Sequence, residues 1–194
     1  MARTQGSRAE ITGPLIREAA LRLFARHGYG AVSMRQIAAA VGVQAGALYA
    51  YTPDKQSLLA DLLEDHMRRV LAGWRDDARL DPVARLERFV RNHIANTLDS
   101  QETVFLSYME LRSLTAENHA RITALRRRYE DALEAILRAG SDAGVMRTQD
   151  TRLATLALIG MLTGVSNWYR DGGRLDRETL MRSYCAFARG AVGA

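Results

Sequence analysis

Between residues 33 and 55 the chain gathers side chains that can hydrogen-bond to a polyanion or neutralise it. They are Ser33, Arg35, Gln44, Tyr49, Tyr51 and Lys55. The Gln44 amide presents a donor and an acceptor side by side, which suits the edge of an adenine. Hydroxyl and basic groups are typical contacts to phosphate oxygens, which position a protein on a duplex. The set predicts a surface that binds nucleic acid; for the two tyrosines, packing in a core is the alternative.

Two short helices joined by a tight turn are expected to carry these side chains. The Ser33 hydroxyl can cap the first helix, with Gln36 reaching back from three residues later. Gly42 ends it, because the left-handed conformation costs little without a Cβ atom. Ala38 allows the two helices to approach, and four apolar residues point inward: Ile37, Val41, Val43 and Leu48. The spacing predicts a helix-turn-helix, with an ordinary helical hairpin as the alternative.

The second helix of such a motif enters the major groove with its N-terminal residues at the base edges. This places Gln44, Ala45, Gly46 and Tyr49 at the DNA. Ala45 can touch a thymine methyl group, and Gly46 lets the backbone come close. Base reading is therefore assigned to this short segment.

The charge distribution favours the same end of the chain. The net charge is +5, and residues 1–56 carry +4 of it, with seven basic against three acidic residues. Residues 1–10 are expected to form an unstructured basic arm, from which Arg3 and Arg8 can reach a minor groove; a disordered solvated tail is the alternative. DNA is the expected partner ahead of a membrane, and a basic solvated face is the alternative.

The composition is that of a globular protein. Of 194 residues, 47% are apolar and 25% charged, which excludes a fibrous or disordered chain. The single cysteine, Cys185, excludes a disulfide framework and a cysteine-cluster metal site. No signal peptide is recognisable, and the uncharged run over 153–169 is expected to be a buried helix rather than a membrane span. A cytoplasmic protein without a membrane partner is predicted.

The hydrophobic spacing is helical almost throughout, so an all-α fold is expected. Each of the three prolines, Pro14, Pro53 and Pro82, stands where a helix can begin. A DNA-binding domain is predicted over residues 1–56 and a second helical domain over 57–194. The expected helices cover about 15–27, 33–41, 45–51, a long one after Pro53, 82–99, 102–114, 117–140, 150–170 and 176–190.

Residues 10–64 resemble the tetracycline-repressor (TetR) family of bacterial regulators. The matching residues are Ser33, Ile37-Ala38, Val41-Gly42-Val43, Gly46, Leu48-Tyr49, Lys55 and Leu58-Leu59. The resemblance implies an N-terminal three-helix bundle with a helix-turn-helix, followed by a helical effector and dimerisation domain, about nine helices in all. The chain departs from the family's pattern at Tyr51, where a histidine is usual, and at Thr52, where a bulky residue is usual.

The resemblance also implies a small-molecule effector and a homodimer formed through the last two helices. The expected pocket residues are Phe89, His93, Phe105, Tyr108, Met109, Arg112, Tyr129, Met161, Asn167 and Trp168. The polar members would orient a ligand, and plain core packing is the alternative for every residue in the set. Trp168-Tyr169-Arg170-Asp171-Gly172-Gly173 is similar to a segment in members that control lipid catabolism and respond to acyl-CoA thioesters.

The predicted function is a ligand-responsive regulator, a repressor released from its DNA operator by a hydrophobic or acyl-CoA-like effector. The alternatives are a helical adaptor for a protein partner and a DNA-binding protein without a small-molecule ligand. Catalysis is not expected, because the four histidines lack metal-ligand spacing and no nucleophile or phosphate-loop motif occurs. No metal site and no cofactor are predicted.

Overall fold

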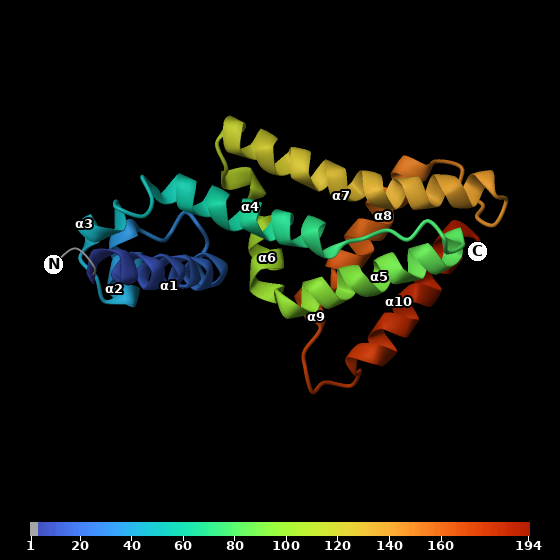
Figure 1. Cartoon of the computed structure of the whole chain (residues 1–194). Helices are drawn as coiled ribbons and strands as arrows, with labels where there is room; N and C mark the ends of the chain where they lie inside the picture. The colour runs from blue at the N-terminus through green and yellow to red at the C-terminus, as the bar shows by residue number, and fades with distance from the viewer. Residues whose placement is uncertain (1–3) are drawn as a thin grey trace. The chain divides into compact units, whose positions relative to one another are not determined.

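The computed structural model describes residues 4–194, with side chains from residue 12 onward. Over this range the fold is all-α, as predicted, and contains no strand (Figure 1). The elements are α1 (Thr4–His27), α2 (Met34–Val41), α3 (Ala45–Leu48), α4 (Lys55–Gly73), α5 (Pro82–Asp99), α6 (Gln101–Met109), the 3-10 turn η1 (Leu111–Ser113), α7 (Ala116–Asp142), α8 (Thr151–Thr163), α9 (Val165–Trp168) and α10 (Arg177–Val192).

Aspartate side chains start three of the later helices. Asp81 accepts hydrogen bonds at 3.0 Å from the N–H groups of Val83 and Ala84, and Pro82 opens α5. Asp150 and Asp176 cap α8 and α10 in the same way. Because these caps satisfy N–H groups that lack helical partners, they define where each helix begins.

The first helix is longer than expected. It begins at Thr4 and continues through Pro14, so the prediction of an unstructured arm is wrong from residue 4 onward. A proline inside a helix removes one backbone hydrogen bond, and the turns on both sides hold the helix together. Arg3 and the side chain of Arg8 lie outside the described residues, so their minor-groove role stays a prediction.

Two other expected helices are interrupted. The segment expected over 102–114 ends at Met109 and continues as η1, because Glu110 leaves the helical conformation. The segment expected over 150–170 divides at Gly164 into α8 and the short α9.

The chain divides into two compact units. The first unit comprises residues up to His66 together with Glu102–Thr123, and the second comprises Met67–Gln101 and Ala124–Ala194. In the first unit α1 packs on α2, and α2 on α3. In the second unit α5 packs on α8, α9 and α10. These packing units are not the predicted functional domains, whose boundary at residue 56 stays a prediction.

Candidate functional site

The start and end of α2 follow the predicted cap chemistry. Ser33 Oγ accepts a hydrogen bond from the Gln36 N–H at 3.3 Å, and Gln36 Oε1 accepts one from the Ser33 N–H at 2.8 Å. At the other end Gly42 has φ 75°, and the following Val43 N–H bonds to Ala38 O at 3.0 Å. The capping box fixes the start of α2, and the glycine turns the chain toward α3.

Gln44 stands at the N-terminus of α3 with its side chain exposed. Its backbone is extended (φ −70°, ψ 144°), and its amide makes no capping hydrogen bond. Gly46 is exposed on the first turn of α3, and its missing Cβ faces open space. Both residues therefore lie at the surface, as base reading requires; Ala45 is half-buried.

The second helix of the helix-turn-helix, α3, is shorter than predicted. α3 ends at Leu48, whereas the sequence predicted a helix to Tyr51. The chain continues in tight turns, in which the N–H groups of Tyr51 and Thr52 both bond to Leu48 O. Thr52 precedes Pro53, and a residue before proline is pushed out of the helical conformation, so no helix continues past this turn.

The two tyrosines of this turn differ in their surroundings. Tyr49 is 58% exposed, whereas Tyr51 is 37% exposed and its ring lies 3.8 Å from where a Cβ on Gly13 of α1 would stand. Tyr49 is therefore open for a phosphate contact, and Tyr51 packs partly against α1. Arg35 on α2 is exposed as well.

Lys55 is held inside the first unit. Its Nζ donates hydrogen bonds to Tyr29 O at 2.9 Å and to Val32 O at 2.8 Å, and it lies 4.3 Å from the centre of the Tyr29 ring. Two of its three donors are thus used on the loop between α1 and α2. Its phosphate contact stays a prediction, and the geometry adds a structural role.

Three of the predicted pocket residues meet in the second unit. The Phe89 ring lies 4.9 Å from the rings of Trp74 and Tyr129. Tyr129 Oη and His93 Nδ1 are 3.3 Å apart, and His93 Nε2 lies 3.1 Å from Thr163 Oγ1. Burial raises the pKa of the Tyr129 hydroxyl. The result is a buried aromatic wall with a row of polar atoms, which we call the Tyr129 cluster.

The other predicted pocket residues are not part of this cluster. Phe105, Tyr108, Met109 and Arg112 belong to the first unit, on α6 and η1, and all four are exposed. Met161 on α8 is half-buried, and Asn167 and Trp168 on α9 are exposed. Their ligand role stays a prediction.

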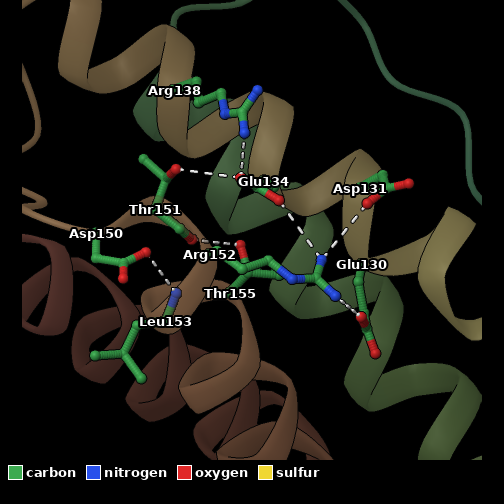
Figure 2. A network of polar contacts seen from close by, with 9 residues as sticks. All are labelled: Glu130, Asp131, Glu134, Arg138, Asp150, Thr151, Arg152, Leu153 and Thr155. Atoms are coloured by element: carbon green, nitrogen blue, oxygen red, sulfur yellow. Dashed lines mark hydrogen bonds and ion pairs between the residues drawn. The ribbon is translucent and has the colours of Figure 1, made fainter.

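Several interacting residues were not anticipated from the sequence. Thr163 of the Tyr129 cluster comes from a helix far along the chain, and nothing in its local sequence distinguishes it. A second unanticipated group is the charged network between α7 and α8, centred on Arg152 (Figure 2).

Among the described residues no group of three or more histidine, cysteine or acidic side chains is placed to hold a metal ion. None of the helices in that same part has the length and apolarity that crossing a membrane requires.

Two family descriptions together match most of the chain. Residues 16–62 match "Bacterial regulatory proteins, tetR family", and residues 79–192 match "Tetracyclin repressor-like, C-terminal domain". The HTH-type transcriptional repressor KstR2 of Rhodococcus jostii (strain RHA1) is 28% identical over 169 residues, which is 85% of this chain and 83% of that protein.

Solved structures give the same relationship over the whole length. A tetR-family bacterial regulatory protein from Rhodococcus RHA1 superposes with a TM-score of 0.88 at 30% identity, covering 93% of this chain and 96% of that one. AibR, solved in complex with isovaleryl coenzyme A and operator DNA, superposes with a TM-score of 0.81 at 28% identity, covering 91% of this chain and 97% of that one. The chain belongs to the tetracycline-repressor (TetR) family and is a ligand-responsive, DNA-binding transcriptional regulator.

Proposed function

We propose that the chain is a homodimeric repressor that acts in the cytoplasm and is released from its operator by an acyl-CoA thioester. The observation that carries this is the likeness, over nine-tenths of the chain, to a regulator solved with an acyl-CoA and operator DNA. The known relatives are regulators, and no enzymatic activity is proposed for this chain.

On the DNA side, the proposed contacts divide by function. Gln44, Ala45 and Gly46 read base edges, because they begin the helix that enters the major groove. The remaining predicted residues hold the phosphates: Ser33, Arg35, Tyr49, Tyr51 and Lys55. Arg35 and Tyr49 carry most of this role, because the Ser33 hydroxyl already caps α2 and Lys55 already binds two carbonyls.

On the effector side, the Tyr129 cluster supplies what an acyl thioester needs. Trp74 and Phe89 offer aromatic surface to an acyl chain. His93 and Tyr129 offer polar atoms in a buried setting, where one hydrogen bond to a thioester carbonyl would fix its orientation. The segment Trp168–Gly173 points to the same ligand class through its similarity to acyl-CoA-responsive members.

The dimer proposal rests on apolar surface along the last long helices. Leu156 on α8 is 46% exposed and Phe187 on α10 is 58% exposed. Gly160 on α8 and Gly190 on α10 are exposed, and a Cβ at either would meet open space. α8 and α10 pack on each other within the subunit, so a partner's pair would complete a four-helix interface.

A titration of the repressor–DNA complex tests the function. The full chain is bound to the region upstream of its own gene, and release is followed by fluorescence anisotropy as isovaleryl-CoA or palmitoyl-CoA is added. Release by an acyl-CoA but not by free coenzyme A supports the proposal. No sequence-specific binding at moderate salt would favour the adaptor alternative, and specific binding that no acyl-CoA weakens would exclude this effector class.

Gln44→Ala is expected to change operator preference rather than general affinity. A bidentate contact to a base discriminates by about 1–3 kcal/mol, so preference for the operator over random DNA should fall by one order of magnitude or more. Parallel anisotropy titrations on both DNAs measure it, and Tyr49→Phe is the matched control, because loss of a phosphate contact weakens both alike. An equal loss on both DNAs from Gln44→Ala would refute the base-reading role.

A further inference from the structure

Tyr29, in the loop between α1 and α2, is bonded through its backbone and its side chain at once. Its N–H donates to Glu110 Oε1 at 3.0 Å, and its carbonyl accepts from Lys55 Nζ at 2.9 Å. Its Oη accepts from Gln56 Nε2 at 3.1 Å, and the Lys55 ammonium lies over its ring. Because α2 begins only five residues later, whatever fixes Tyr29 fixes the start of the helix-turn-helix.

Gln56 joins Tyr29 to the N-terminus of α7. Its Nε2 also donates to Ser113 O at 2.9 Å, and its Oε1 accepts from the Thr115 N–H at 3.0 Å. Thr115 directly precedes α7 and accepts the His119 N–H at 2.8 Å. One side chain of α4 therefore touches both the α1–α2 loop and the first turn of α7.

Glu110 makes the second connection. It lies where α6 ends, and its carboxylate accepts Ser113 Oγ at 2.5 Å as well as the Tyr29 N–H. Gly28, the residue before Tyr29, has φ 80°, and a Cβ there would stand at an ordinary contact distance of 3.6 Å from Glu110 Oε1. Tyr29, Gln56 and Glu110 together form what we call the Tyr29 latch.

α7 is one continuous helix that begins at this latch and carries Tyr129 further along. We propose that the Tyr29 latch transmits effector binding to the DNA-binding element, with Glu110 and Gln56 as the positioning residues. An effector that displaces Tyr129 displaces α7, and the latch passes that movement through Tyr29 to the start of α2. The part of this inference that concerns the effector rests on the proposed function.

The latch itself is tested without effector. In Glu110→Ala the Tyr29 N–H loses its acceptor, so its hydrogen exchange is expected to become about tenfold faster or more, because exchange follows local opening. Operator affinity is expected to fall about threefold to tenfold as the α1–α2 loop loosens. Glu110→Gln keeps an acceptor oxygen and should retain both the slow exchange at Tyr29 and the operator affinity. Glu102→Ala, at an exposed acid in the first turn of α6, is the matched control. Unchanged exchange at Tyr29 in Glu110→Ala overturns the latch.

The transmission is tested with isovaleryl-CoA as the probe. In the wild type we expect the probe to weaken operator binding, and we call the ratio of operator affinities without and with the probe the release factor. In Glu110→Ala the release factor should be smaller by about fivefold or more, which is within the usual range of coupling between two sites. Binding of the probe to DNA-free protein, followed by tryptophan fluorescence, should stay within about twofold of the wild type in the same comparison. A full release factor in Glu110→Ala overturns the transmission. If the probe does not release the wild type, the proposed effector class fails, while the latch is still decided by the exchange and affinity measurements.

Discussion

Replacing Phe89 by alanine is expected to lower the free energy of unfolding by about 3–5 kcal/mol. The side chain is fully buried, with Trp74 on one side and Tyr129 on the other. Truncation removes apolar contacts with both rings and leaves a cavity that the two remaining aromatic walls cannot fill. Since domains are stable by only about 5–15 kcal/mol, this single change should remove a large share of the total.

Urea denaturation of the purified variant, followed by circular dichroism, measures the loss. Phe105→Ala is the matched control, because Phe105 is also a helical phenylalanine but is 38% exposed. It should cost less than about 1 kcal/mol, as is usual at the surface. Similar losses in the two variants would show that the Tyr129 cluster is not a packed centre of the second unit.

The parts of the fold that the sequence predicts well depend on short-range chemistry. The Ser33–Gln36 capping box and the Asp81–Pro82 helix start each involve residues within three positions of one another. Gly42 adopts the left-handed conformation for the reason that made it a predicted helix end. Such signals are complete within a single turn, so tertiary packing has little opportunity to override them.

The errors arise where longer-range or competing effects decide. Pro14 was interpreted as a helix start, yet the helical turns on both sides outweigh the one lost hydrogen bond. α3 was expected to reach Tyr51 but ends at Leu48, where the N–H groups of Tyr51 and Thr52 both bond to Leu48 O in a turn.

In the candidate site, too, local spacing predicts some of the residues, whereas others depend on contacts between distant parts of the chain. Phe89, His93 and Tyr129 were found because large apolar residues with polar groups among them recur at helical spacing. Glu110 and Gln56 were not found, because their value comes from Tyr29, which is 81 and 27 positions away. Lys55 was singled out by type for a phosphate contact, which stays a prediction, and the carbonyls it binds are visible only once the α1–α2 loop is placed.

Arg152→Met should destabilise the second unit through the network that joins α7 to α8. The Arg152 guanidinium pairs with Glu130 and lies 3.5 Å from carboxylate oxygens of Asp131 and Glu134, as Figure 2 shows. Without it, these three acidic side chains of α7 lose the positive charge that they share. We expect the free energy of unfolding to fall by about 2 kcal/mol. This is less than the ~3–5 kcal/mol that breaking a fully buried ion pair costs, because water screens a side chain that is one-third exposed.

The pH dependence of this loss identifies its cause. Burial alone would raise the pKa of Glu134, but hydrogen bonds and attraction from Arg138, Thr151 and Arg152 outweigh it and hold that pKa below its usual value. A carboxyl whose pKa is lowered by folding stabilises the fold above its unfolded pKa of about 4.3, and that contribution is lost as the pH falls through the lower folded value. The difference in melting temperature between the wild type and Arg152→Met should therefore be largest near neutral pH and shrink below about pH 4.

Thermal unfolding by circular dichroism at a series of pH values measures this difference, with Arg128→Met as the control. Arg128 is exposed on α7, so its removal deletes the same charge without opening the network, and its effect should stay small at every pH. A difference for Arg152→Met that does not change between neutral and acid pH would mean that its aliphatic packing, rather than its pairing with the α7 carboxylates, holds α8 in place. The same comparison bears on signalling, because α7 carries both Tyr129 and the residues that pair with Arg152. If those ion pairs stiffen α7 against α8, Arg152→Met should also reduce the release of operator DNA by isovaleryl-CoA.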